Sequence, residues 1–519
     1  MEKEKEALGR RAARTLSAML LANVSGLILG IATIFAVARL LGPSNYGAYT
    51  IAVSYYLLID AALYFGIGQY FNKRLSELEH IGNKEKLLSA LSSGLILALL
   101  FSTALTLIGI GAAAYVAQVY ASFGVSFLTL AVASFVMFFS ILFGACNNAL
   151  IGFGEVKVAA LTSIVENAVQ LAACILLILL GFGFNGAVAG IAIGYLAGFA
   201  ASFSALMAVA GKHARLGFVF DKKEIRYAFK FCTPIALSSA LNNGTNVFST
   251  LLLGIFVTAS LLGNFGLAFR GINIITVVSG TAPVAAIPVL AIALSKRSDK
   301  RKLGNTYNKT ISYSLLITLP IMVFIAVFAK QLVYLVSPRY SLAPMYLSLM
   351  AVGLMLYIPG IFASNLLVAS GETKRLLKYM GIINLIEFVL LLLLVPFYGA
   401  LGAIAAVFFI GSAISTYLLM KGTARLFKIK TDYGKMLKIF VSCAALALAF
   451  GLVYFIPGAA LQLLCGVAVL FVLYPVFAVV SGAVSKEDAK ELRRAVSGIP
   501  ALRKSAGFMI SYISFLTGR

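Results

Sequence analysis

Five charged side chains lie inside long apolar stretches of the sequence, where a charge is costly and usually faces a cavity or a partner. They are Arg39, Asp60, Glu166, Arg270 and Glu387. With a rise of about 1.5 Å per helical residue, Arg270 lies near the middle of its stretch, and Glu166 and Glu387 lie at a similar depth in theirs. A guanidinium at that depth can hold a phosphate group through two parallel hydrogen bonds. A carboxylate there can bind an ion or pair with the guanidinium.

Each of these charges has a structural alternative. For Arg270 we predict a place in a substrate cavity, and the alternative is an ion pair with Glu166 or Glu387. For the two glutamates and for Asp60, ion coupling and charge pairing stay open. Arg39 lies one turn from a loop, so its side chain can reach the membrane interface. An anchoring role is favoured for it, and we keep it among the candidate cavity residues.

A polar helix face supplies the other candidate contacts. Side chains at three- and four-residue spacing form it: Ser239, Asn242, Asn243, Asn246, Ser249 and Thr250. A fainter counterpart near the N-terminus contains Asn23. Amide side chains both donate and accept hydrogen bonds, which suits sugar hydroxyls, and the alternative is hydrogen bonding between helices. The predicted cavity residues are therefore Arg270, Asn242, Asn243, Asn246, Asn23 and Arg39.

Composition identifies the elements that must position these residues. Of 519 residues, 61% are hydrophobic and only 12% are charged, and the mean hydropathy is +0.99. Soluble domains have about 25% charged residues, and a helix of about 20 apolar residues spans a bilayer. We therefore predict an all-α polytopic membrane protein of about 14 transmembrane helices, at residues 15–41, 46–71, 87–117, 124–150, 158–180, 186–211, 228–254, 258–294, 305–329, 340–369, 376–396, 400–424, 438–456 and 459–482.

The basic residues give the expected orientation. The net charge is +24, but Lys and Arg gather in alternate connections rather than in one patch, so they do not indicate nucleic acid. This alternation follows the positive-inside rule and predicts that both termini are cytoplasmic. His80 and His213 stand alone, the five cysteines have neither metal nor disulfide spacing, and no phosphate-binding loop of the nucleotide-hydrolysing type occurs. No catalytic residue, metal or cofactor is predicted, apart from a coupling ion, H+ or Na+.

An internal repeat divides the chain. Asn148, Gly154, Glu155 and Lys157 recur 217 residues later, Asn23 matches Asn242 at 219, and Gly186-Ala187 matches Gly399-Ala400 at 213. Because each copy would contain six spans, the two copies are predicted to be parallel. The predicted parts are a cytoplasmic tail (1–14), an N-lobe (15–211), a linker (212–227), a C-lobe (228–424), two extra helices (438–482) and a cytoplasmic or interfacial tail (485–519).

The hairpin at Val37–Tyr49 contains A-R-L-L-G-P-S-N-Y-G-A-Y, in which Gly42 and Pro43 supply turn chemistry. Together with the G-E-V-K turn at 154–157, this segment resembles the polysaccharide flippases of the multidrug/oligosaccharidyl-lipid/polysaccharide exporter superfamily, over residues 10–480. The resemblance implies two six-helix lobes forming a V around a central cavity. It also implies alternating access for a lipid-linked oligosaccharide, with coupling to an ion gradient in some members.

The expected protein is thus a flippase of the cell membrane and not an enzyme. Its expected partners are a lipid-linked glycan, membrane lipids and glycosyltransferases or a polymerase of the same pathway, with no nucleic acid, and we expect a monomer. The alternative function is an ion-coupled drug or metabolite antiporter of the same superfamily. A membrane enzyme would need a substantial external loop with acidic or histidine residues, whereas the connections predicted to be external are only a few residues long.

Overall fold

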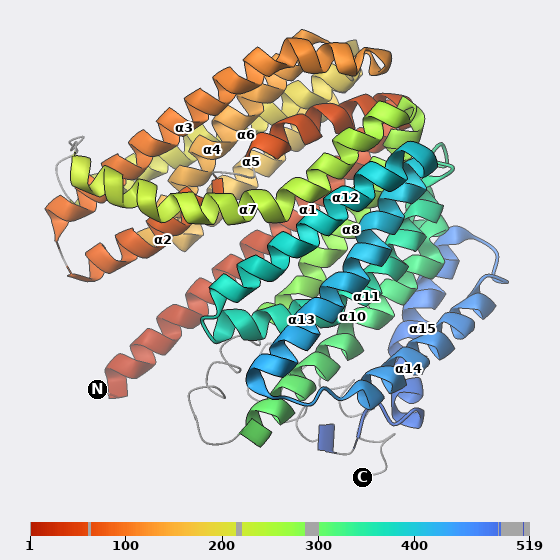
Figure 1. Cartoon of the computed structure of the whole chain (residues 1–519). Coiled ribbons are helices and arrows are strands. Elements are labelled where there is room, and N and C mark those ends of the chain that lie inside the picture. The colour runs from red at the N-terminus through yellow and green to blue at the C-terminus, as the bar shows by residue number, and fades with distance from the viewer. Residues whose placement is uncertain are drawn as a thin grey trace. The chain divides into compact units, whose positions relative to one another are not determined.

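The computed structural model describes residues 2–60, 64–81, 83–213, 221–285, 300–485, 487–488 and 512 (Figure 1). Their regular structure is helical throughout. In chain order the elements are α1 (Glu2–Asp60), α2 (Tyr64–Ile81), α3 (Lys84–Val119), η1 (Ala121–Phe123), α4 (Phe127–Gly152), α5 (Val156–Leu177), η2 (Ile178–Phe182), α6 (Gly183–His213), α7 (Lys222–Phe256), α8 (Ala259–Ala285), α10 (Lys300–Val336), α11 (Ala343–Ala369), α12 (Thr373–Ile404), η3 (Ala405–Gly411), α13 (Ser412–Phe427), α14 (Tyr433–Val453) and α15 (Ala459–Val480).

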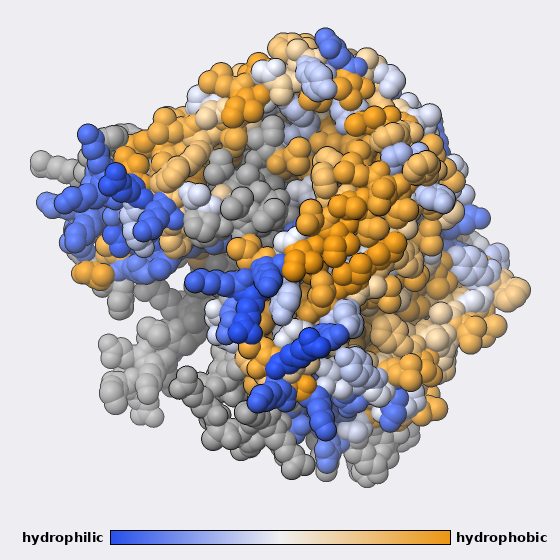
Figure 2. Space-filling view, in the orientation of Figure 1, coloured by the Kyte–Doolittle hydropathy of each residue, from blue (hydrophilic) through white to orange (hydrophobic). Residues whose placement is uncertain are grey.

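The described helices confirm the membrane class. Nine continuous helical segments among them are long and apolar enough to cross a membrane. Three of these, Ser25–Leu58, Val156–Gly211 and Lys374–Phe427, each contain all or part of two predicted spans. The visible surface is largely hydrophobic (Figure 2), and side chains such as Leu179 and Leu448 are 67% and 77% exposed. Apolar surface of this extent suits contact with lipid. The kink expected at Pro288 and most of the C-terminal tail lie outside the described residues.

Contacts between Cα atoms divide the chain into two compact units. The first comprises Met1–Leu267 with Leu391–Ala403, and the second comprises Ala268–Leu390 with Ile404–Arg519. The first unit therefore includes α7, the beginning of α8 and the end of α12. The predicted lobes at 15–211 and 228–424 follow the sequence repeat rather than packing, and they stay predictions.

In the first unit, the hairpin residues of α1 pack directly on the beginning of α8. Gly42 breaks the helix with φ 70° and ψ 174°, a conformation open to glycine. Beyond it, a Cβ added at Gly47 would lie 2.0 Å from the carbonyl oxygen of Ala259, and one at Gly263 would lie 1.9 Å from that of Pro43. The two segments that echo each other in the sequence thus touch backbone to backbone, as small residues allow between membrane helices.

The basic end of the first unit is held by an ion pair between α2 and α7. Arg74 donates from Nε to Oε1 of Glu224 at 2.7 Å, and from a second nitrogen to Oε2 at 2.9 Å. The guanidinium also lies 5.0 Å from the ring centroid of Tyr227. Asp221 caps α7 by accepting from the backbone nitrogen of Lys223 at 2.8 Å. Two parallel bonds fix the geometry of such a pair, so this contact defines how α7 lies on α2.

The repeat is visible in backbone hydrogen bonds. After α4, the amide of Glu155 donates to Leu150 O at 2.9 Å, and after α11, that of Glu372 donates to Leu367 O at 3.0 Å. The glycines preceding these residues, Gly154 and Gly371, have φ of 75° and 77°. All three matches have the offset of 217 residues seen in the sequence. The turn after each fourth helix is therefore the same structure twice.

The second hairpin of each copy corrects the sequence alignment. Gly183 has φ 54° and ψ −137°, and Gly399 has φ 54° and ψ −128°. These two glycines are 216 residues apart, so the backbone pairs Gly399 with Gly183 rather than with Gly186. The predicted shortening of four residues between the copies is wrong, because the offset changes by only one.

The second unit is packed around aromatic rings shared by α10, α14 and α15. Phe328 and Phe450 are fully buried, with ring centroids 5.2 Å apart, and Phe324 lies 5.8 Å from Phe450. Gly466 makes room for this cluster, since a Cβ there would lie 2.6 Å from the ring of Phe328. The two helices outside the repeat are thus joined to α10 by large apolar contacts.

Candidate functional site

The structure describes some of the predicted cavity residues and not others. Arg270 lies on α8 in the second unit and is partly buried, while Arg39 lies on α1 with its side chain exposed. The helices place Asn23 on α1 and the three asparagines, Asn242, Asn243 and Asn246, on α7. The side chains of these four, and that of Asp60 at the end of α1, lie outside the described residues. Their role in a cavity stays a prediction.

Glu166 is enclosed between α5 and α6. Its residue is 5% exposed, and its Oε2 accepts from Nδ2 of Asn167 at 2.6 Å. Gly198 of α6 lies so close that a Cβ there would be 2.7 Å from Cβ of Glu166. An ionised carboxylate at such a place in hydrocarbon costs about 3 kcal/mol on insertion scales. The sequence retains a costly group in a site built by a glycine.

Glu387 is held in the same manner in the second unit. It lies on α12 and is partly buried, and a Cβ added at Gly411 would lie 2.5 Å from its Oε1. At an offset of 217 residues, Glu387 and Gly411 correspond to Gln170 and Gly194. A Cβ at Gly194 would lie 2.5 Å from Cβ of Gln170, so the same packing recurs with a neutral amide in place of the acid.

Sequence reasoning missed the feature that positions these groups. On α6, four glycines recur at every fourth residue and lie against α5: Gly186, Gly190, Gly194 and Gly198. This is a repeated small-xxx-small pattern, which brings membrane helices into close contact. The spacing was present in the sequence and would have indicated which face of α5 carries Gln170 and Glu166.

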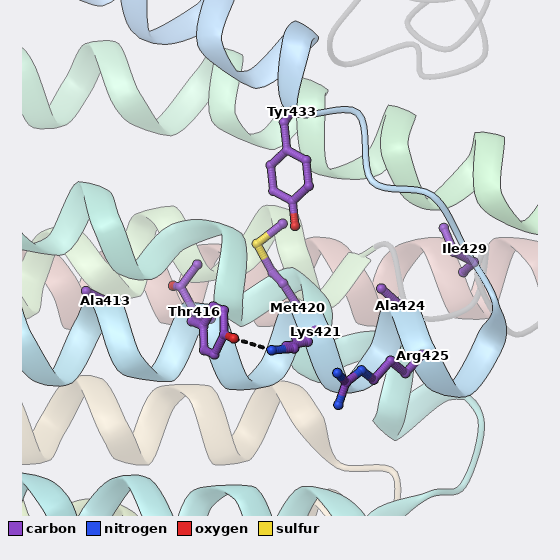
Figure 3. A pocket seen from close by; sticks show the side chains of 9 residues that line it. Ala413, Thr416, Met420, Lys421, Ala424, Arg425, Ile429 and Tyr433 are labelled. Carbon is purple, nitrogen blue, oxygen red and sulfur yellow. Dashed lines mark hydrogen bonds between the residues drawn. The ribbon is translucent and has the colours of Figure 1, made fainter.

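A basic and aromatic hollow at the end of α13 was also missed (Figure 3). It has a volume of about 690 Å³, and a neighbouring hollow of about 380 Å³ shares Lys421 and Arg425 with it. Lys421 donates from Nζ to the hydroxyl of Tyr417, and its charge lies 4.6 Å from the centroid of that ring. The sequence treats these basic residues as markers of orientation, so their convergence on a cavity could not be seen there.

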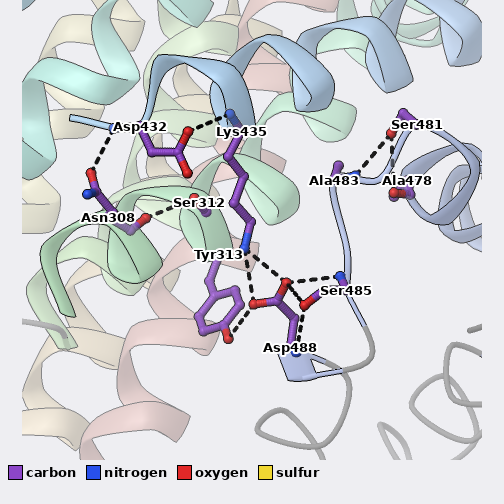
Figure 4. Close-up of polar contacts among 10 residues, drawn as sticks. All are labelled: Asn308, Ser312, Tyr313, Asp432, Lys435, Ala478, Ser481, Ala483, Ser485 and Asp488. Carbon is purple, nitrogen blue, oxygen red and sulfur yellow. Dashed lines mark hydrogen bonds and ion pairs between the residues drawn. The ribbon is translucent and has the colours of Figure 1, made fainter. Parts of the chain in front are cut away.

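Beside this hollow, α14 is fastened to the segment that follows α15 (Figure 4). Asp488 accepts from Nζ of Lys435 at 2.9 Å and from the hydroxyl of Tyr313 at 3.0 Å. Burial acts to raise the pKa of Asp488, but hydrogen bonds from Ser485 and Lys435 outweigh it and hold that pKa below its ordinary value. Lys435 therefore has an acidic partner of its own.

These observations define a class of protein: a multi-pass helical membrane protein built from a duplicated set of helices, with carboxylates enclosed between apolar helices. Among the described residues, no group of three or more His, Cys, Asp or Glu could hold a metal ion. The chain belongs to the polysaccharide biosynthesis protein family, whose sequence model matches residues 36–339, more than half of the chain. Among curated protein sequences none matches it.

Solved structures show the same fold at low sequence identity. The lipid II flippase MurJ in an inward closed conformation has a TM-score of 0.70 and 16% identity, covering 89% of this chain and 98% of its own. An inward-facing multidrug resistance MATE family transporter of the MOP superfamily has 0.67 and 18%, covering 76% and 94%. A MOP superfamily transporter from Pyrococcus furiosus has 0.53 and 17%, covering 80% and 95%. The fold is that of MOP superfamily transporters.

Proposed function

We propose that this protein is a flippase that moves a lipid-linked oligosaccharide across the cytoplasmic membrane by alternating access. The observation that carries the proposal is the combination of a polysaccharide biosynthesis family with a transporter fold. A lipid-linked sugar must cross the bilayer before it can be used outside, and a fold that exposes a site to each side in turn meets that need. The substrate class is supported by the family and by the flippase likeness.

The proposed substrate contacts follow from the chemistry of the cargo. Arg270 replaces the hydration of a diphosphate, and Asn242, Asn243, Asn246 and Asn23 exchange hydrogen bonds with sugar hydroxyls. Arg39 anchors the first hairpin at the outer interface. Glycosyltransferases or a polymerase of the same pathway are the proposed partners, acting on the lipid-linked glycan before and after it crosses.

Loss of the gene tests this function directly. A strain without it should lack the surface polysaccharide and accumulate lipid-linked oligosaccharide in the inner leaflet, and the intact gene should reverse both effects. The competing function, a drug or metabolite antiporter, would leave the polysaccharide at its normal level. It would also give ion-driven uptake of cationic drugs by proteoliposomes containing the purified protein.

The proposed orientation places the basic connections in the cytoplasm. In a background whose five cysteines are replaced by alanine, His80→Cys and Lys430→Cys should react with an impermeant thiol reagent only from the cytoplasmic side. Ser44→Cys and Tyr398→Cys should react only from outside. Reaction of any one of these from the opposite side, reproduced in inverted vesicles, would contradict both the orientation and the cytoplasmic termini.

Glu387 is proposed as an ion-coupling residue, with Glu166 and Asp60 as the other candidates and H+ or Na+ as the ion. The structure offers a mild test, because Gln170 already occupies the equivalent place against its glycine. Glu387→Gln should therefore fold and reach normal membrane abundance, while export falls by tenfold or more and no longer responds to the ion gradient. Surface glycan and membrane abundance are measured together in the strain without the native gene.

The reciprocal variant, Gln170→Glu, serves as the control for packing. If both variants reach the membrane and only Glu387→Gln loses export, the carboxylate itself is needed. Undiminished, gradient-dependent export by Glu387→Gln would exclude this residue from coupling and leave Glu166 and Asp60, to be tested by Glu166→Gln and Asp60→Asn in the same assay.

A further inference from the structure

Two hollows flank the end of α13 and share its last basic residues. The larger is lined by Thr416, Tyr417 and Tyr433 among others, and the smaller by Arg375 and Tyr379, while Lys421 and Arg425 contribute to both. Neither lining contains an Asp or a Glu. All of these residues belong to the second unit. Positive charge is therefore concentrated at concave sites, which suits an anion with several acceptor oxygens.

The neighbouring basic residues differ in having acidic partners. Lys435 pairs with the carboxylate of Asp488 at 2.9 Å, and Nε of Arg375 lies 3.2 Å from Oε2 of Glu372. The contact drawn for Lys421 in Figure 3 is instead with the hydroxyl of Tyr417. Lys421 and Arg425, four residues apart on one helix face, are therefore the pair best placed to meet an added anion.

Tyrosine hydroxyls give the hollows further hydrogen-bonding capacity. Tyr379 lies over Gly422, where a Cβ would be 2.6 Å from its hydroxyl oxygen, so the missing side chain at 422 makes room for this phenol. Tyr417 and Tyr433 are 57% and 64% exposed. Phenolic hydroxyls can donate to phosphate oxygens, and tyrosine is frequent where membrane and water meet.

The same face of α13 and the preceding η3 becomes apolar away from the basic end. Ile410 and Ala413 are exposed at three- and four-residue spacing before Tyr417, and all lie within the segment Lys374–Phe427, which is apolar enough to span a membrane. In Figure 2 the lengths of α12 and α13 are mainly hydrophobic, and hydrophilic residues gather at one end. A ligand that follows this face would have a charged head and an apolar chain.

We propose that the hollows beside α13 bind the phosphate headgroup of a membrane lipid, with Lys421 and Arg425 contacting the phosphate and the lipid chain lying along Ile410 and Ala413. Basic pockets between membrane helices hold anionic headgroups in this way. The site goes beyond the proposed flippase function, because a lipid can bind here whether or not it is the cargo. Both a phosphodiester lipid and a polyprenyl diphosphate present the required chemistry.

Native mass spectrometry of the purified full-length protein tests the proposal. The probes are dioleoyl phosphatidylglycerol, undecaprenyl diphosphate, zwitterionic dioleoyl phosphatidylcholine and inorganic phosphate. For an anionic lipid, Lys421→Gln/Arg425→Gln should raise the Kd about thirtyfold, since each basic residue at a membrane surface contributes roughly a factor of five. The matched control is Lys374→Gln/Lys430→Gln, which removes the same charge from exposed residues that line neither hollow.

The two lipid arms identify the source of the phosphate, because a loss confined to one lipid in the test variant assigns the site to that lipid. An unchanged Kd for both anionic lipids would overturn the proposal, and so would an equal loss in the control variant. Binding of inorganic phosphate as tightly as of lipid would refute the role of the apolar face. If the double variant unfolds, Arg425→Gln alone should still weaken binding about fivefold. None of these outcomes depends on transport, so failure here and failure of the flippase function are distinguishable.

Discussion

Gly263→Ala should remove most of the folded protein from the membrane. The new Cβ would lie 1.9 Å from the carbonyl oxygen of Pro43 and 3.1 Å from the backbone nitrogen of Gly47. Backbone atoms cannot rotate aside as a side chain can, so α1 and α8 must separate. Overpacking usually costs about 1–3 kcal/mol, and a clash with backbone on both helices places this variant at or above the upper end. Membrane abundance and thermal unfolding in detergent measure the loss.

The same helix supplies the control. A Cβ at Gly271 would be 3.5 Å from Cδ1 of Leu347, an ordinary contact, so Gly271→Ala should be close to neutral or slightly stabilising. If Gly263→Ala were as abundant and as stable as Gly271→Ala, the backbone contact between the two echoed segments would not contribute to folding.

Arg270→Ala should abolish export, and Arg270→Lys should retain part of it. Both follow from the proposed contact with a diphosphate, for which lysine keeps the charge but loses the two-pronged grip. The assay is surface glycan in the strain lacking the native gene, with membrane abundance measured alongside. Arg270 is partly buried on a helix of the second unit, so removing its side chain should leave insertion intact.

Two results would count against this role. Full export by a well-expressed Arg270→Ala protein would exclude Arg270 from substrate recognition. Loss of the protein from the membrane would instead indicate a structural ion pair, for which Glu166 and Glu387 are the predicted partners.

Much of the fold could be predicted because its signals are local. Apolar length predicts each span, and Gly42 with Pro43 predicts the break in α1, which the structure places at Gly42. The repeat could be found because Gly154 and Gly371 both need a positive φ at a helix end, which keeps glycine at both positions. Gly183 was missed because Gly181, Gly183 and Gly186 are all near the turn, and only the backbone angles select among them.

The candidate site was harder, since it depends on which helix faces meet. Glu166 and Glu387 drew notice as the two acids of corresponding helices, whereas the packing pairs Glu387 with Gln170. A neutral amide gives no sequence signal of the kind that a charge in an apolar segment does. Likewise, Lys421 and Arg425 fit the positive-inside pattern completely, so nothing in their spacing required a cavity.

The first unit has a consequence for biosynthesis. Its residues run continuously to Leu267, but it is completed only by Leu391–Ala403, where a Cβ at Gly399 would lie 3.2 Å from Cγ1 of Val257. A ribosome adding about 5–20 residues per second needs on the order of 10 s to make the intervening chain. During that interval the early helices are inserted without their last packing partner, and the surface around Val257 is open to lipid or to a chaperone.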